Sequence, residues 1–539
     1  MPIWTKVLGI GFALLALNAS LSFHNIWPTL WVHLRPELSV EAAAILLFVA
    51  IRSAWFGAMS MPTRYLIATV LLFLVLGRYV DVTAPALYGR PINFYWDAQH
   101  IPRVAAMIFK DDHAWLVIIS MLALTLVAVC LFVGLAYVLA VLSRAVQRPQ
   151  TRLCLGSLAA SVLTLYAIGM ASREVATERW FSIPVSWMYV RQLSFAHAAL
   201  VGHPSDGRFA PGQSLNSDFA QLKGRDAYLI FLESYGEIVF NEATIAQALV
   251  PAFKALSESA EKDGWHAVTA SYESPTFGGA SWLSHATLMT GAWIAEQDKY
   301  QLLLTTDRRS LVQHFQDAGY RAVALMPGLK MAWPEGAFYN YDKIWNATAL
   351  KYRGPTFGWW RIPDQYSLAR FYNAEGANND RQPLFVFFTT ITSHMPFIPT
   401  PPYQIDWSRL LSSTPYDEDM LSSALDVSLD WDDLRTAYTR AIEYDLHVLG
   451  DLLRITAHQE PIIIALGDHQ PPALVAGAGA SWIVPVHIFA REEAILQPFI
   501  DSGFRRGLRP KGPALGRLDQ LHGLILRGFD SGWRKEIYD

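Results

Sequence analysis

Cysteine is nearly absent from this chain. Only Cys130 and Cys154 occur among 539 residues, and both stand inside apolar segments. The long remainder therefore has no thiol for a disulfide framework, a cysteine metal site or a cysteine nucleophile.

Charged residues are also scarce, and neither sign is in large excess. They make up 17% of the chain, against 52% hydrophobic residues, and the formal net charge is −4. Globular domains usually carry about 25% charged residues, so we expect part of this chain to lie in lipid. The small net charge favours neither a nucleic acid nor an acidic partner.

Long apolar segments fill the first third of the chain. Residues 114–142 contain no charged side chain, and this stretch exceeds the roughly 20 residues that cross ~30 Å of hydrocarbon. The five spans that we expect are residues 7–23, 42–59, 65–77, 114–142 and 153–170. The first could instead be the apolar region of a signal peptide, because Lys6 precedes it, but the aromatic sequence that follows favours an uncleaved anchor.

Arginines between the spans indicate the orientation. Arg144, Arg148 and Arg152 lie between the last two spans without an acidic residue, and Arg64 lies between two earlier spans. Because short positive loops stay in the cytoplasm, we expect everything after residue 170 to lie outside it.

We predict three regions along the chain. Residues 1–171 form a transmembrane domain, 172–223 a juxtamembrane linker with an amphipathic helix, and 224–539 a separate domain. In this last domain the predicted strands are 228–232, 321–325, 384–388, 462–466 and 483–489, and the predicted helices are 281–289, 310–318 and 434–456. The alternation predicts an α/β fold with a mainly parallel sheet between helices.

Three of the predicted strands run directly into residues that bind metals. Glu233 follows the strand at 228–232, and Asp468 and His469 follow the one at 462–466. His394 comes shortly after the strand at 384–388. Parallel strands end at one edge of a sheet, where α/β proteins bind their ligands. Carboxylates with imidazole suit one divalent ion, Zn²⁺ or Mn²⁺.

A glycine-containing turn precedes a helix that begins with a serine. Gly278 and Gly279 allow close backbone approach, and Ser281 stands at the predicted start of the helix, where an anion is favoured. A metal ion would lower the pKa of the Ser281 hydroxyl and make it a nucleophile. His285 lies one turn later on the same face, and it could hydrogen-bond a substrate or leaving group. The alternative interpretation is that Ser281 is a plain N-cap of this helix.

These motifs resemble those of the alkaline phosphatase/sulfatase superfamily. The likeness is strongest to its membrane-anchored branch of lipoteichoic acid synthases and phosphoglycerol transferases, which places five transmembrane helices before an extracellular catalytic domain. The resemblance implies that Glu233, Ser281, Asp468 and His469 bind the metal, with Ser281 as nucleophile. It also implies that His394 contacts the phosphate of the substrate.

The substrate-binding segment of that branch matches less well. Its tryptophan corresponds to Trp333, and its GW..PD element is similar to the sequence around Trp360 and Asp364. The arginine that contacts phosphoglycerol falls on Glu335, an acid that would repel a phosphate. Phosphoethanolamine transferases of the superfamily have disulfide-rich outer domains, so the absence of cysteine argues against that group.

The resemblance implies a metal-dependent phosphotransferase in the inner membrane of a bacterium, with its catalytic domain on the periplasmic or extracellular side. It would move a phospho-alcohol headgroup from a lipid donor to an envelope glycan or a glycerol-type acceptor, through a phospho-serine. A phosphatase or phosphodiesterase is the alternative, and a non-catalytic membrane sensor is a further one. The oligomeric state stays open.

Overall fold

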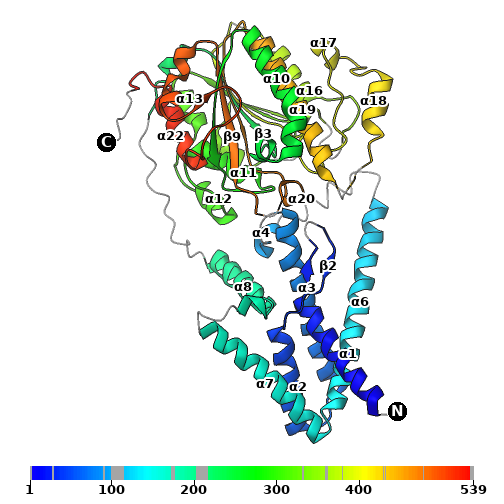
Figure 1. Ribbon diagram of the computed structural model, residues 1–539. Helices are drawn as coiled ribbons and strands as arrows, with labels where there is room; N and C mark the ends of the chain where they lie inside the picture. Colours follow the sequence, from blue (N-terminus) through cyan, green and yellow to red (C-terminus); the bar gives the residue numbers. More distant parts are fainter. Residues whose placement is uncertain are drawn as a thin grey trace. The chain divides into compact units, whose positions relative to one another are not determined.

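The computed structural model describes residues 3–26, 29–88, 92–98, 114–171, 177–201, 216–330, 333–357, 362–378, 380–428, 430, 433–477 and 479–533. The chain divides into two compact units, Met1–Ser205 and Asp206–Asp539. Long helices make up the first unit, and a sheet covered by helices makes up the second (Figure 1). Trp360 lies outside the described residues.

Helices dominate the first unit, as its apolar sequence predicts. Its elements are α1 (Ile3–Ser22), β1 (His24–Asn25), β2 (Val32–His33), α2 (Val40–Phe56), α3 (Met61–Tyr88), α4 (Phe94–Ala98), α6 (Ala114–Ala145), α7 (Pro149–Ala171), η1 (Thr177–Arg179) and α8 (Val185–Val201). By length and composition α1, α3, α6 and α7 could each cross a membrane. The remaining predicted span, 42–59, coincides with α2, which is shorter at 17 residues. Among the described residues, four helices are thus long and apolar enough to cross a membrane, where about five spans were expected.

The membrane helices pack through small side chains. Helix α2 lies along α7, and α6 contacts both α1 and α3. Ala13, Ala50, Ala68 and Ala159 are buried at these contacts, and small residues let helix backbones approach closely. Elsewhere α6 exposes large apolar side chains such as Leu122 and Leu124. This distribution suits helices surrounded by lipid.

Part of the predicted linker belongs to this first unit. Helix α8 packs on α3, and the hydroxyl of Tyr189 donates to the carbonyl of Phe73. The buried guanidinium of Arg78 donates to the carbonyls of Phe23 and Ile183. Residues 177–201 are therefore held against the membrane helices, while 172–176 and 202–215 lie outside the described residues.

The second unit contains the remaining elements. Its strands are β3 (Ala227–Leu232), β4 (His266–Glu273), β5 (Arg321–Met326), β6 (Lys343–Asn346), β7 (Leu384–Thr389), β8 (Ile462–Gly467), β9 (Ile483–Ala490) and β10 (Arg505–Arg506). Its larger helices are α10 (Ala243–Lys262), α11 (Ser281–Thr290), α16 (Asp364–Phe371), α18 (Glu418–Leu425), α19 (Leu434–Thr456) and α22 (Leu518–Gly528). Its shorter helical segments are η2 (Ala220–Leu222), α9 (Ile238–Asn241), α12 (Gln297–Leu303), α13 (Leu311–Asp317), α14 (Gly336–Tyr339), α15 (Ala347–Leu350), η3 (Tyr372–Gly376), α17 (Trp407–Leu410), α20 (Ala473–Ala476), η4 (Glu493–Leu496) and α21 (Gln497–Asp501).

The eight strands form one sheet in the order β10-β4-β9-β8-β3-β7-β5-β6. The strands from β8 to β6 are parallel, as predicted, and they include all three strands that carry the candidate ligands. Strand β9 runs antiparallel to both β8 and β4, and β10 is antiparallel to β4. Strands β4, β6 and β10 were not among the predicted strands.

Helices cover both faces of the sheet (Figure 1). Along β3 the side chains of Tyr228 and Ile230 join the core beneath α10, α16 and α19. Those of Leu229 and Phe231 join the opposite core, beneath α13 and α22. Both faces are buried because every residue of β3 is apolar, which is the pattern of a central parallel strand.

Candidate metal and nucleophile site

The candidate site begins where β3 and β8 end. These parallel strands are paired in register, with Leu232 opposite Gly467. Glu233 comes directly after β3 and Asp468 directly after β8, so these two residues lie side by side. His469 is the next residue after Asp468. All three side chains are buried.

Gly467 allows the two strand ends to come this close. A Cβ atom at this position would lie 1.8 Å from the backbone oxygen of Tyr235. No side chain fits there, so any larger residue would push the end of β8 away from the segment that follows β3.

A left-handed turn presents the serine. Gly278, Gly279 and Ala280 have φ values of 66°, 144° and 61°. Ala280 is the cap of α11 and Ser281 is its first helical residue. Because the Ser281 hydroxyl does not cap the helix, it is available for the candidate site.

Four of the predicted residues meet here in direct contact. The hydroxyl oxygen of Ser281 lies 3.1 Å from Glu233 Oε2 and 3.1 Å from His469 Nε2. His469 Nε2 is 3.5 Å from both Glu233 Oε1 and Asp468 Oδ2. One ligand atom from each of Glu233, Asp468 and His469 falls within 4.8 Å of the others.

Hydrogen bonds orient two of these ligands. His469 Nδ1 lies 2.7 Å from the carbonyl oxygen of Gln470, so Nδ1 carries the proton and donates, and Nε2 keeps its lone pair toward the site. Asp468 Oδ1 accepts from the backbone N–H groups of Ser234 and His469, at 2.8 and 2.7 Å. Its other oxygen, Oδ2, is buried and has no hydrogen-bond partner within the described chain.

In the described part of the chain, the buried carboxyl groups of Glu233 and Asp468 have no positively charged partner that would neutralise both of them. Burial, and then the charge of Asp468, raise the pKa of Glu233 well above its usual range. Burial also opposes ionisation of Asp468, but the neighbouring His469 and His285 lower its pKa overall. The site contains two buried carboxyl groups, one of which has the unpartnered oxygen, and the lone pair of an imidazole. One divalent cation would neutralise and coordinate this set. The residues present therefore fit the predicted metal.

His285 lies one turn beyond Ser281 on α11. Its ring packs against Phe231 and Phe387, with ring centres 4.4 and 5.6 Å away. Its Nε2 atom is buried and has no partner among the described residues. Burial lowers the pKa of His285 to about 4, so the ring is neutral at pH 7.

His394 follows β7 and is half-buried. Its Nδ1 atom lies 2.7 Å from the carbonyl oxygen of Met395. Burial lowers its pKa. The preceding residue, Ser393, donates to the backbone carbonyl of Glu233, so the segment that carries His394 lies at the same edge of the sheet as the four clustered residues.

Trp333 and Glu335 occupy a neighbouring aromatic region. The ring of Trp333 stacks on Tyr339 at 5.7 Å, and Tyr341 lies 5.9 Å from Phe387, which also contacts His285. Aromatic contacts thus connect this segment to α11. Glu335 makes no ion pair among the described residues. Burial, and then the charge of Glu335, raise the pKa of Tyr300 to about 12. The structure does not place Trp333 or Glu335 in contact with the four clustered residues.

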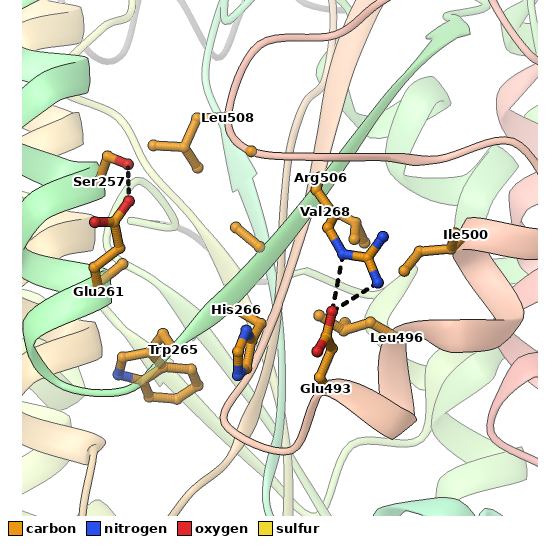
Figure 2. Close-up of a pocket in the computed structure, with 13 residues that line it drawn as sticks. Ser257, Glu261, Trp265, His266, Val268, Glu493, Leu496, Ile500, Arg506 and Leu508 are labelled. Carbon is orange, nitrogen blue, oxygen red and sulfur yellow. Dashed lines mark hydrogen bonds and ion pairs between the residues drawn. The ribbon is translucent and has the colours of Figure 1, made fainter.

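A separate cavity of about 160 Å³ lies at the opposite end of the sheet, where β4 begins. Figure 2 shows two paired sets of side chains in its lining, Ser257 with Glu261 and Arg506 with Glu493. It contains none of the predicted site residues.

The supporting residues around the ligands were missed by the sequence analysis. The backbone N–H of Glu233 donates to the Thr390 hydroxyl, and the Ser274 hydroxyl donates to the carbonyl of Asp468. Thr390 precedes His394 closely and Ser274 precedes Ser281, so proximity in sequence was the one available signal. Small hydroxyl residues are too common for that signal to select them.

No family model matches the sequence, and no curated protein matches it. Among solved structures, the chain is similar to lipoteichoic acid synthase LtaP from Listeria monocytogenes, with 14% identity over 52% of this chain and 68% of that one, and a TM-score of 0.37. It is also similar to the lipooligosaccharide phosphoethanolamine transferase EptA from Neisseria meningitidis, with 14% identity over 98% of this chain and 97% of that one, and a TM-score of 0.49. A protein of the alkaline phosphatase superfamily from Vibrio parahaemolyticus is 15% identical over 61% of this chain and 78% of that one, with a TM-score of 0.36.

These names agree with the superfamily that the motifs resemble. At these identities and TM-scores, activity has to be argued from the candidate site itself.

Proposed function

We propose that this chain is a membrane-anchored, metal-dependent phosphotransferase. It transfers a phospho-alcohol headgroup from a lipid donor to a glycan or glycerol-type acceptor in the cell envelope. The observation that carries the proposal is the contact of the Ser281 hydroxyl with Glu233 and His469, next to the unpartnered Oδ2 of Asp468. A hydroxyl among metal ligands at the start of a helix is suited to attack a phosphate.

One divalent ion, Mn²⁺ or Zn²⁺, would be held by Glu233, Asp468, His469 and Ser281. When bound, it supplies charge that lowers the pKa of the Ser281 hydroxyl and polarises a phosphoryl oxygen. The hydrogen bonds on His469 Nδ1 and Asp468 Oδ1 fix these ligands before any substrate arrives.

The transfer proceeds in two displacements at phosphorus. Ser281 Oγ loses its proton and forms an Oγ–P bond, while the bond from phosphorus to the lipid alcohol breaks and that oxygen gains a proton. An acceptor hydroxyl then attacks the phospho-serine, and Ser281 regains its proton as the Oγ–P bond breaks. His394 and His285 hydrogen-bond the phosphate or the leaving oxygen. Because burial keeps both rings neutral, they act through hydrogen bonds rather than as cations.

The apolar helices support a lipid donor. They confine the protein and its substrate to one surface, which raises their effective concentration. We place the chain in the inner membrane of a bacterium, with the sheet unit on the periplasmic or extracellular side, because the arginine-rich loops between the spans favour the cytoplasm. If water replaces the acceptor, the same residues make a phosphodiesterase.

Labelled lipid tests the proposal. The purified full-length chain is incubated with headgroup-labelled phosphatidylglycerol or phosphatidylethanolamine and Mn²⁺ or Zn²⁺, with and without a glucan acceptor. We expect metal-dependent release of diacylglycerol and label on the acceptor. Release of free headgroup phosphate without an acceptor would favour hydrolysis, and no turnover of either lipid under any condition would contradict the proposal.

Ser281→Ala is expected to abolish turnover while metal still binds, because three ligands remain. Ser257→Ala, in the cavity at the far end of the sheet, is the matched control and should keep wild-type activity. Full activity in Ser281→Ala would move the nucleophile elsewhere, with Ser284 and Thr276 the next hydroxyls to test.

A further inference from the structure

Ser393 is completely buried beneath the candidate metal site. Its hydroxyl oxygen lies 2.6 Å from the backbone carbonyl oxygen of Glu233 and 2.6 Å from Oδ2 of Asp445, a residue of α19. Both are distances of strong O–H···O hydrogen bonds. Asp445 is itself buried, so water does not satisfy these groups.

Counting protons decides how these bonds are made. A serine hydroxyl has one hydrogen, a backbone carbonyl oxygen can only accept, and an ionised carboxylate can only accept. If Asp445 were ionised, the Ser393 proton could serve one neighbour, and the other would face the Ser393 oxygen at 2.6 Å without a proton between them. Both contacts are satisfied when Ser393 donates to Glu233 and a protonated Asp445 donates to Ser393.

We infer that Asp445 is a neutral carboxylic acid that donates to Ser393 and thereby positions the metal ligand Glu233. The protonation state of Asp445 does not depend on the proposed function. The expected effect of Asp445 on turnover rests on it. Asp445 is a positioning residue, because it acts through Ser393 and the Glu233 backbone.

A second buried acid shows the opposite pattern. Asp364 accepts from the N–H groups of Ile391 and Thr392, and from the Thr392 hydroxyl at 2.5 Å. All its partners are donors, so Asp364 is the ionised one of the two buried acids Asp364 and Asp445. Burial raises the pKa of Asp364 to about 6, against these hydrogen bonds. Burial, followed by the charge of Asp364, raises the pKa of Asp445 well above its usual range.

Together the two acids fix the segment 390–394 that ends in His394. Thr390 accepts from the N–H of Glu233, and Ser393 donates to the carbonyl of the same residue. Both backbone polar groups of Glu233 are therefore held by one segment, which Asp364 and Asp445 anchor from below. Loss of either anchor should loosen Glu233 and His394 together.

Substitution by asparagine distinguishes a protonated aspartic acid from an ionised one. In Asp445→Asn the amide N–H can replace the acid proton and donate to Ser393, so we expect metal affinity and kcat within about threefold of wild type. In Asp445→Ala that donor is lost. In Asp364→Asn an NH2 group replaces one of the two carboxylate oxygens, so a donor faces the backbone N–H donors. Loss of such supporting contacts costs about 10- to 100-fold in metal affinity or activity. The losses should appear in metal affinity and kcat, with little change in KM for the lipid.

Metal affinity, measured by titration of the full-length variants, does not require turnover, so failure of the proposed phosphotransfer would leave this test intact. Asp445→Asn as damaged as Asp445→Ala, in protein that elutes and melts like wild type, would show an anion and overturn the inference. Infrared spectroscopy of the metal-loaded wild type, in a detergent without ester groups, covers the case in which variants fail to fold. A neutral carboxylic acid band at pH 8 supports the inference, and its absence overturns it.

Discussion

At the scale of single residues, Glu335 separates this chain from the branch that it resembles. An arginine there would attract phosphate, whereas Glu335 is an acid two residues after Trp333, and its charge is, after burial, the second cause of the raised pKa of Tyr300. Aromatic faces with a carboxylate form a suitable environment for a cation, such as the ammonium of an amino alcohol. We therefore expect Glu335 to disfavour an uncharged or anionic headgroup.

The matching experiment exchanges the charge. Glu335→Arg should shift the ratio of kcat/KM for phosphatidylglycerol over phosphatidylethanolamine upward by about tenfold, which corresponds to ~1.4 kcal/mol. Glu335→Gln should give an intermediate ratio. The ratio is measured with both labelled lipids in the same vesicles. An unchanged ratio in both variants would mean that Glu335 does not face the headgroup.

At the scale of elements, the parallel ends of β3 and β8 create the cluster of candidate metal ligands. Their register brings Glu233 beside Asp468, and Gly467 has no side chain that would push away the segment after β3. The turn before α11 then delivers Ser281 to the same edge. The cluster therefore depends on backbone separations of a few ångströms, which the two strands set.

Gly467→Ala tests this dependence. The new Cβ would meet the Tyr235 oxygen, and overpacking of this kind costs about 1–3 kcal/mol. We expect a lower melting temperature of the purified protein and a loss of metal affinity of at least about tenfold, since displaced ligands no longer converge.

Gly450→Ala is the control for that experiment. Gly450 lies within α19, and its Cβ would make only an ordinary contact, 3.5 Å from Leu256. Alanine is favoured over glycine in a helix by about 1 kcal/mol, so this variant should keep metal affinity and melt at an equal or higher temperature. Equal behaviour of the two variants would contradict the role given to Gly467.

At the scale of the whole molecule, the chain joins lipid-exposed helices to a water-exposed α/β unit. The large apolar side chains on the outside of α6 contrast with the two buried cores of the sheet unit. Because the chain has only two cysteines, each in a membrane helix, its orientation can be measured by labelling.

A chain with Cys130→Ala and Cys154→Ala provides the background. In intact cells, a membrane-impermeant maleimide should label Ser412→Cys, which is an exposed position of the sheet unit. It should label Gln150→Cys, an exposed position at the start of α7, only once the cells are lysed. The reverse pattern would place the candidate site in the cytoplasm and exclude an envelope acceptor.

The sequence by itself determined the helical membrane segments, the buried strands and the residues at the strand ends. Apolar length fixes a span, and a wholly apolar β-branched run fixes a central strand, because lipid and a two-sided core accept nothing else. Glu233, Asp468 and His469 could be predicted because they follow these strands directly. Ser281 could be predicted because it follows a glycine turn at the start of a helix. The order of the strands and the antiparallel direction of β9 could not be predicted from the sequence.

The partners that support those residues could be found only in the folded chain. Asp445 stands far from Glu233 in the sequence and belongs to a helix with many other charged side chains, so no local pattern distinguishes it. The inference that Asp445 carries a proton depends on the position of the Ser393 hydroxyl between the Glu233 carbonyl and the Asp445 carboxyl group. A hydrogen bond depends on distance and direction across the folded chain, and the sequence does not encode these locally.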